Sequence, residues 1–191
     1  VCGVGAWFCL KIAITLEDVV NGEWFVSATR AGTMVHARLG IAEENSGKLV
    51  SVVRDAARKE AEASGSPLIL VDGSPGVGCP VIASITGVCL AVAVSEPTCS
   101  GLHDLRRIAE LAGHFHVPMA VIVNKSDINP EITDEILAFC EAEGLHAIGQ
   151  IPYDESVTDA MIARQSIVEH GGEAARAVET AWERIRELLA S

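Results

Sequence analysis

From residue 48 onward, the chain alternates between stretches with the apolar spacing of a helix and short apolar runs. The helical spacing covers residues 48–64, 101–116, 132–143, 157–164 and 173–189. The apolar runs are residues 67–72, 88–94, 119–123 and 147–151. A strand buried on both faces is a continuous apolar run, and strands that alternate with helices form parallel sheets through right-handed crossovers. The alternation therefore predicts an α/β fold, with a mostly parallel sheet flanked by helices.

The first 47 residues follow a different pattern. Residues 23–27 and 34–39 are short strand-like runs on either side of a turn around Gly32. This pattern predicts a two-stranded hairpin. Because 49% of the 191 residues are hydrophobic, the chain is long enough and apolar enough to bury a sizeable core.

The acidic composition restricts the kinds of partner. The formal net charge is -12, and a surface this acidic repels the phosphate backbone of DNA and RNA, so we predict no bulk nucleic-acid binding. The charge does not exclude a local nucleotide site, because main-chain amides and one or two lysines suffice to build one. No apolar run approaches the roughly 18 residues of a membrane helix, so we predict no membrane span.

The six cysteines indicate a reducing compartment. A disulfide scaffold would be shorter and richer in cysteine, and the sequence shows no signal peptide. We therefore predict a cytoplasmic protein with reduced thiols. Since the chain begins with Val1 in place of methionine, we also expect the natural protein to extend upstream.

The first motif with chemical meaning is the apolar run 68–71 and the Asp72 that ends it. In a parallel sheet, this strand would deliver the carboxylate to the edge where open α/β folds bind ligands. An aspartate there can hold a magnesium ion through its waters, as Walker B acids do. Residues 73–78 are rich in glycine and proline, which suits a loop that approaches a phosphate. The alternative is a plain strand-to-turn junction.

The second motif is Asn124-Lys125-Ser126-Asp127, directly after the apolar run 119–123. In P-loop proteins such a group lies beside the nucleotide base, where its amide and carboxylate bond to ring edges and its lysine stem covers a ring face. A polar strand end that caps the next helix is the alternative. Residues 151–154 could close over the base from the other side, although alone they indicate no more than a turn.

Together these strings resemble the MinD/ParA group of P-loop ATPases. They are most similar to the subgroup that carries a ferredoxin-like insert, the cobyrinic acid a,c-diamide synthase-like nucleotide-binding proteins. The matching stretches are residues 35–39, 43–50, 72–84, 95–98, 100–105, 124–127 and 151–154. The resemblance divides the chain into residues 1–22, a C-terminal remnant of the insert, and residues 23–191, a P-loop NTPase domain without its Walker A strand and loop.

The resemblance also implies roles for the motifs. The catalytic acid is Asp72, which holds magnesium through water, and residues 73–78 form the switch loop that senses the terminal phosphate. The implied nucleotide-binding residues are Lys48, Gly73, Pro75, Gly76, Asn124, Lys125, Asp127, Pro152 and Asp154. The implied base is adenine, and members of the group dimerise around ATP. For Lys48, helix capping by Asn45 or Ser46 is an equally good explanation.

Two departures from the family pattern matter. The Walker A loop, which supplies most of the phosphate binding, is absent, so this chain alone is expected to bind ATP poorly and hydrolyse none. In the insert, Cys2 and Cys9 align with the second and fourth cysteines of a ferredoxin half, while Gly5 replaces the third. An ordinary four-iron cluster takes four thiolates. We expect a degenerate or cluster-free insert, with Cys2 and Cys9 as possible remnant ligands.

The remaining chemistry-bearing residues have simpler explanations. The six histidines show no metal-ligand spacing with a cysteine partner, and His114 and His116 fall at a helix end, where histidine completes the last turn. Cys79 lies in the switch loop and could be redox-active, although a small buried thiol is the commoner case.

The leading functional prediction is an ATP-dependent switch, in which nucleotide closes a homodimer and hydrolysis with Mg²⁺ opens it. In the intact protein the insert would couple this cycle to electron transfer or iron–sulfur handling, with a further protein partner that the sequence does not identify. Two alternatives remain: a non-catalytic binding module that has lost the nucleotide cycle, and a GTPase, which rests on residues 124–127 alone.

Overall fold

The computed structural model describes residues 22–39 and 47–190 of the chain. Contacts divide the chain into two compact units, Val1–Leu70 and Val71–Ser191. The predicted boundary between residues 22 and 23 falls at the edge of the described part and stays a prediction. Among the helices within the described residues, none is long and apolar enough to cross a membrane.

The described residues of the first unit form a β-hairpin and one helix. β1 (Gly22–Thr29) pairs antiparallel with β2 (Gly32–Leu39), which confirms the predicted hairpin. Gly32 has a φ of +124°, a positive value that glycine adopts without steric cost. α2 (Gly47–Ser64) confirms the predicted helix 48–64 and contacts β2. The described residues of this unit are all exposed or only partly buried.

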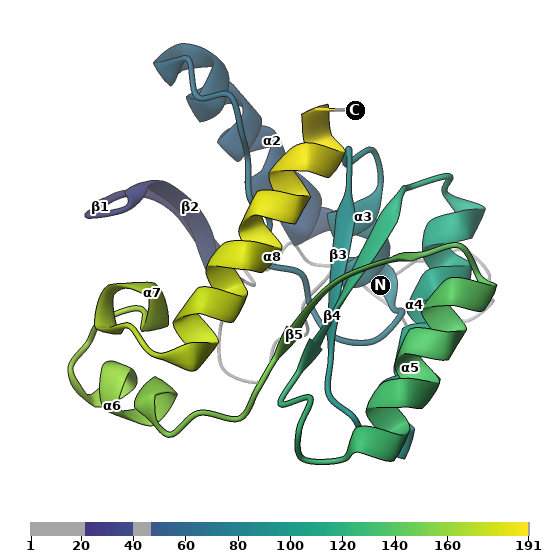
Figure 1. Ribbon diagram of the computed structural model, residues 1–191. Helices are drawn as coiled ribbons and strands as arrows, with labels where there is room; N and C mark the ends of the chain where they lie inside the picture. The colour runs from purple at the N-terminus through teal and green to yellow at the C-terminus, as the bar shows by residue number, and fades with distance from the viewer. Residues whose placement is uncertain (1–21, 40–46, 191) are drawn as a thin grey trace, which may run out of the picture. The chain divides into compact units, whose positions relative to one another are not determined.

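The second unit is built on a three-stranded parallel sheet. The strands are β3 (Ala91–Ser95), β4 (Met119–Asn124) and β5 (His146–Ile151), in the order β3-β4-β5. Ala91 is opposite Met119 and Ala120 is opposite His146, with a register irregularity between Val121 and Ile122. Parallel pairing of strands that alternate with helices confirms the predicted fold class (Figure 1).

Helices cover both faces of this sheet. α4 (Cys99–His114) and α5 (Pro130–Ala142) pack on one face, and α8 (Glu173–Ala190) packs on the other (Figure 1). All three correspond to predicted helices, as does α6 (Ser156–Ile162). Two short helices, α3 (Cys79–Ile85) and α7 (Ile167–His170), were not predicted, because four to seven residues are too few for a clear apolar period.

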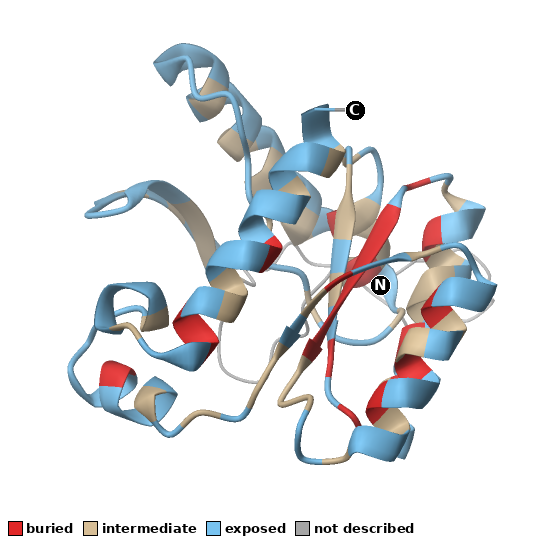
Figure 2. Cartoon of the chain, in the orientation of Figure 1, coloured by how far each residue is buried: buried red, intermediate tan, exposed pale blue. Residues whose placement is uncertain are grey.

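The core lies on either side of β4, whose residues from Met119 to Val123 are all buried (Figure 2). Side chains alternate across a strand. Val121 and Val123 therefore pack with Ile136 of α5 in one cluster, whereas Ala120 and Ile122 pack with Ala181 of α8 in the other. β4 accordingly has the continuous apolar composition that the sequence indicated for a central strand.

The segment 67–72 differs from the prediction, because it has no regular secondary structure. Leu68, Ile69 and Leu70 are exposed by 44%, 42% and 83%. A parallel strand depends on a neighbouring strand to satisfy its main-chain N–H and C=O groups, and no described strand pairs with this segment. An apolar run is therefore necessary for a buried strand but not sufficient.

The run 88–94 also differs in part from the prediction of a buried strand. The strand β3 begins only at Ala91, and Val92 and Val94 are exposed by 36% and 63%. β3 is the edge strand of the described sheet, and the α8 cluster packs on β4 and β5, with Leu90 at its margin. Among the described residues of this unit, none covers the face of β3 that carries the two valines.

Candidate functional site

Three loops meet at the carboxyl edge of the parallel sheet. They follow β3, β4 and β5, at residues 95–98, 124–127 and 151–154. Lys125 Nζ lies 2.7 Å from Glu96 Oε1, and the main-chain N–H of Tyr153 donates to Asp127 Oδ1 at 2.6 Å. In open α/β sheets, ligands bind at this edge, so the joined loops are the candidate functional site.

The turn after β4 has an unusual backbone conformation. Lys125 has a φ of +52°, in the left-handed region that glycine adopts most easily. For a residue with a side chain, this conformation costs about 1–3 kcal/mol. Surrounding hydrogen bonds fix the turn: Ser126 N donates to Ile151 O at 3.0 Å, and Thr133 Oγ1 donates to Ser126 O at 2.7 Å.

The ion pair between Lys125 and Glu96 joins the loop after β4 to the loop after β3. Its side chains are exposed by 39% and 49%, and an exposed pair of this kind contributes about 0.2–1 kcal/mol. This contribution does not exceed the cost of the left-handed turn. The pair therefore acts chiefly to fix the position of the ammonium group, and contributes little to the stability of the fold.

Asp127 joins the corner after β4 to the corner after β5. Its side chain is exposed, and Oδ1 accepts the hydrogen bond from Tyr153 N. A carboxylate has about four acceptor sites, so this bond leaves capacity for a ligand. The structure thus brings the predicted base-binding residues 124–127 together with residues 152–154.

Asp154 has a structural role in this arrangement. Oδ2 accepts hydrogen bonds from the N–H groups of Glu173 and Ala174 at 3.1 Å, at the start of α8, and Oδ1 accepts from Ser156 N at 2.9 Å. The Ser156 side chain and these main-chain donors lower the pKa of Asp154 to about 2. The Ser156 side chain is the largest cause of the lowered pKa. Within the described residues, however, no partner of good hydrogen-bond geometry faces the buried Oγ of Ser156.

The capping bonds account for the Asp154 carboxylate without a ligand. The N-terminus of a helix carries partial positive charge and free N–H groups, both of which favour a carboxylate. The predicted contacts of Asp154 and Pro152 with a nucleotide stay predictions.

Asp72 precedes a loop that leads into α3. Asp72 is exposed and does not end a strand, since segment 67–72 has no regular structure. In the loop, Gly76 has a φ of +87°, and Gly78 precedes the first residue of α3. The predicted roles of Asp72, Gly73, Pro75 and Gly76 at the phosphates therefore stay predictions.

Three other predicted site residues lie elsewhere in the chain. Lys48 is exposed in the first turn of α2, in the unit Val1–Leu70. Cys2 and Cys9 lie outside the described residues. Within residues 22–39 and 47–190, no three His, Cys, Asp or Glu side chains are grouped so that they could hold a metal ion.

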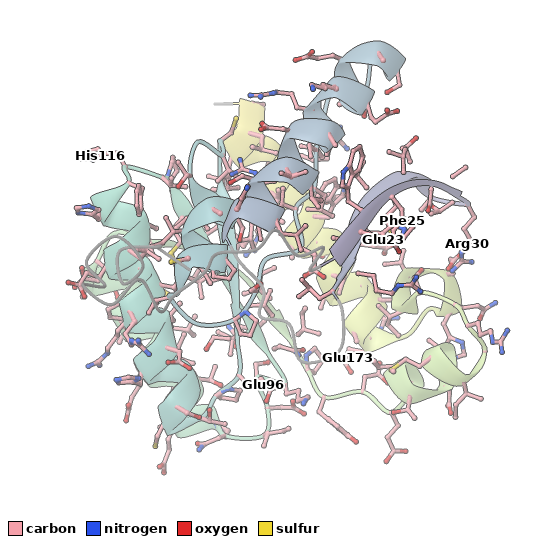
Figure 3. The ribbon with its side chains drawn as sticks, turned by 180° about the vertical axis from the view of Figure 1, so that it is seen from behind. Glu23, Phe25, Arg30, Glu96, His116 and Glu173 are labelled. Atoms are coloured by element: carbon pink, nitrogen blue, oxygen red, sulfur yellow. The ribbon has the colours of Figure 1, made fainter. Side chains whose placement is uncertain are left out.

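Glu96 is the site residue that the sequence reasoning missed. It comes two residues after the apolar run 88–94, and Asn124 comes directly after the run 119–123, so its place after a strand was a usable signal. It was not assigned a role, because a single acidic residue after a strand does not indicate which neighbouring side chain it meets. Figure 3 labels Glu96 among the side chains of the unit that carries the parallel sheet.

Comparison with known proteins adds a distant sequence relative. No protein-family model matches the chain. The chain is similar to Uncharacterized protein MJ0578 of Methanocaldococcus jannaschii, with 26% identity over 156 residues. The match covers 82% of this chain and 51% of the archaeal protein. The chain therefore spans about half the length of this relative.

Solved structures of MinD proteins share the architecture. The MinD cell division protein of Aquifex aeolicus matches with a TM-score of 0.60 and 21% identity, over 72% of this chain and 61% of that chain. MinD of Pyrococcus horikoshii, solved with Mg-ADP, matches with a TM-score of 0.59 and 16% identity, over 75% and 58%. A MinC:MinD complex from Aquifex aeolicus matches with a TM-score of 0.61 and 19% identity, over 85% of this chain and 66% of that chain.

At these levels of identity the likeness concerns the arrangement of helices and strands. In this chain that arrangement is a parallel sheet with helices on both faces. We conclude that the matched part of the chain has the α/β fold of these MinD structures.

Proposed function

We propose that the intact protein is a nucleotide-binding ATPase of the MinD/ParA type, which hydrolyses ATP with Mg²⁺ and switches a homodimer between two states. The observation that carries the proposal is the joined corner at residues 124–127. It lies at the ligand-binding edge of a parallel sheet and is held to its neighbours through Glu96 and Tyr153. The MinD fold of the chain supports the same proposal.

In this proposal the corner after β4 holds the nucleotide base. The amide of Asn124 and the free acceptor sites of Asp127 bond to the ring edges, and the alkyl stem of Lys125 covers a ring face. Pro152 and the residues beside it close the other side. Asp154 acts indirectly, because its hydrogen bonds to the start of α8 hold these residues in place.

The phosphate side of the site is assigned to Asp72 and residues 73–78. Magnesium prefers oxygen ligands and is held in such enzymes by one or two carboxylates together with substrate phosphates. The exposed Asp72 carboxylate has the right chemistry for this role. Lys48, in the first turn of α2, is the further candidate for a phosphate contact. When bound, the ion would neutralise charge on the phosphates.

The reaction is the attack of water on the terminal phosphate of ATP, which gives ADP and phosphate. In phosphoryl transfer, catalysis comes almost entirely from positioning and charge stabilisation. Most of the phosphate-binding amides and lysines belong to a Walker A loop. We propose that upstream chain supplies this loop, so that the present 191 residues alone are inactive.

The partners are also proposals. One matched structure is a MinD protein with Mg-ADP, and another is a MinC:MinD complex. By analogy, the intact protein would use ATP with Mg²⁺, form a homodimer, and contact a further protein. The proposal of an iron–sulfur link rests on Cys2 and Cys9 alone. Iron analysis of the intact protein after anaerobic purification tests it, and a preparation without iron would refute the link.

The test is Mg²⁺-dependent ATP turnover by the protein encoded by the complete gene. Asp72→Ala should reduce turnover by about a hundredfold or more, the order of the loss when a charge-stabilising group is removed. Asp134→Ala, on the exposed face of α5, is the matched control and should turn over ATP like wild type. Equal turnover in the wild type and Asp72→Ala would refute the role of Asp72.

The same assay separates the proposal from its alternatives. Stronger competition by GTP than by ATP would replace the adenine assignment by a GTPase. A protein that binds nucleotide without turning it over would be a non-catalytic binding module. The position of Asp72 outside any described strand is the observation that keeps this second candidate open.

A further inference from the structure

The backbone at Lys125 has a left-handed conformation, which glycine adopts most easily. Its φ of +52° is one of three positive values at non-glycine residues within the described part of the chain. Glycine would adopt this conformation without steric cost. A lysine at this position indicates that its side chain contributes something that glycine cannot.

What the Lys125 side chain contacts is Glu96. The 2.7 Å separation between Nζ and Oε1 is that of a charge-assisted hydrogen bond. The two residues follow neighbouring strands, β3 and β4, so the bond spans the carboxyl edge of the sheet. It neutralises the ammonium group and leaves the alkyl stem as the part of Lys125 that can contact a ring.

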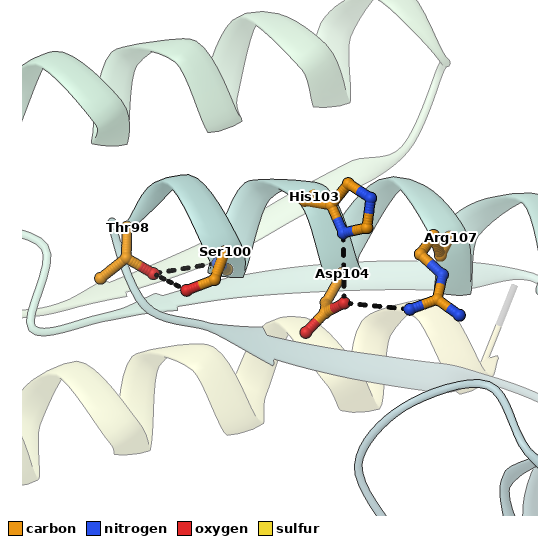
Figure 4. Close-up of polar contacts among 6 residues, drawn as sticks. Thr98, Ser100, His103, Asp104 and Arg107 are labelled. Atoms are coloured by element: carbon orange, nitrogen blue, oxygen red, sulfur yellow. Dashed lines mark hydrogen bonds and ion pairs between the residues drawn. The ribbon is translucent and has the colours of Figure 1, made fainter.

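The backbone of Glu96 is held in place by the start of α4. Thr98 N donates to Glu96 O at 2.8 Å, and Gly101 N donates to Thr98 Oγ1 at 2.9 Å. Figure 4 shows Thr98 at the start of α4. Ser95 is buried. A Cβ at Gly101 would overlap the Glu96 carbonyl oxygen, so helix and loop are in close contact. Glu96 is therefore a carboxylate on a rigid base.

We propose that Glu96 is a positioning residue of the nucleotide site. Its carboxylate holds the Lys125 side chain, and in this way adds to the hydrogen bonds that hold the turn presenting residues 124–127 to the base. The identity of the ligand rests on the proposed function, whereas the positioning itself is a property of the loops. Because the pair is neutral, this corner recognises the heteroaromatic base and not the phosphates.

The experiment uses the protein encoded by the complete gene and measures two ligands. Glu96→Gln keeps the shape of the side chain and removes its charge. It should weaken ATP binding by about twofold to fivefold, the range that an exposed ion pair provides. Competition by inorganic tripolyphosphate, which has no base, should stay unchanged. Glu135→Gln, exposed on α5, is the control and should alter neither ligand.

A double-mutant cycle assigns the effect to the pair. Lys125→Met should weaken ATP binding, and adding Glu96→Gln should cost little more, because both changes remove the same interaction. Additive losses would overturn the proposal. So would equal ATP affinity in Glu96→Gln and wild type, or a parallel loss for ATP and tripolyphosphate. None of these results would affect the proposed function if wild type binds ATP.

A second readout needs no nucleotide. Amide hydrogen exchange at Ser126 and Tyr153 reports whether the turn is held, because their N–H groups donate to Ile151 and Asp127. Exchange at both should be faster in Glu96→Gln. Unchanged protection would overturn the positioning role. If wild type bound no nucleotide, the proposed function would fail, and the exchange rates would still decide whether Glu96 positions the corner.

Discussion

At the scale of single residues, Asp127 and Asp154 illustrate two uses of a carboxylate at the same edge of the sheet. Asp127 is exposed and accepts one main-chain hydrogen bond. Asp154 accepts bonds from three main-chain donors, two of them at the start of α8. Each lies three residues after the end of a strand, β4 or β5. The number of main-chain donors that meet each carboxylate distinguishes them: Asp154 anchors the start of α8, whereas Asp127 keeps free acceptor sites.

The lowered pKa of Asp154 predicts a pH-dependent contribution to stability. Its ordinary value is 3.8, and in the fold it is about 2. Folding therefore favours the charged form, and this contribution is complete above about pH 4 and lost as the pH falls toward about 2. Asp154→Asn should therefore lower the free energy of unfolding above about pH 4. As the pH falls toward about 2, the free energies of unfolding of the variant and the wild type should become equal.

Urea unfolding across this pH range measures the difference. Asp159→Asn, exposed on α6, is the control. A difference between wild type and Asp154→Asn that is the same at every pH would show that charge is not what Asp154 contributes.

At the scale of elements, α4 depends on a glycine at its first turn. A Cβ at Gly101 would overlap the Glu96 carbonyl oxygen and lie 3.1 Å from the side-chain oxygens of Ser95 and Thr98. Gly101→Ala should therefore destabilise the protein by about 1–3 kcal/mol, as overpacking does. In Gly113→Ala, nothing lies within 4 Å of the new Cβ, so a gain of about 0.5 kcal/mol is expected from helix propensity.

The two variants form a matched pair, because both replace a glycine of the same helix. Their free energies of unfolding in urea should differ in sign relative to wild type. Equal effects would mean that Gly101 is not in close contact with the loop after β3, which would also weaken the argument that Glu96 has a rigid base.

The elements also show where sequence patterns succeed. The predicted strand 119–123 became β4, and the predicted helices at residues 101–116 and 132–143 became α4 and α5 with ends shifted by one or two residues. The apolar spacing of each is a local property of the chain. The run 67–72 is also apolar, but no described strand pairs with it, and it forms no strand.

At the scale of the whole molecule, the buried core of the described residues lies in one unit. Every buried hydrophobic residue among the described ones, from Val81 to Ala181, lies within Val71–Ser191. Residues 71–191 expressed alone should therefore unfold in one cooperative urea transition with native helix content by circular dichroism. Residues 1–70 alone should show no cooperative transition, since chains of this size rarely fold without a substantial core.

These two fragments are each other's controls. A cooperative transition in residues 1–70 would show that this unit has a core that its described residues do not reveal. A gradual transition in residues 71–191 would show that the sheet needs further chain, as the exposed valines of β3 would then suggest.

The sequence by itself determined most of the helices and strands, the parallel α/β class and the polar groups that follow β4 and β5, because apolar spacing and strand ends are local features. Only the tertiary structure decided which of these groups meet. Tyr153 and Asp127 are 26 residues apart, and Asp154 and Glu173 are 19 apart. Such contacts depend on which strands pair and where helices begin, and no local pattern contains that information.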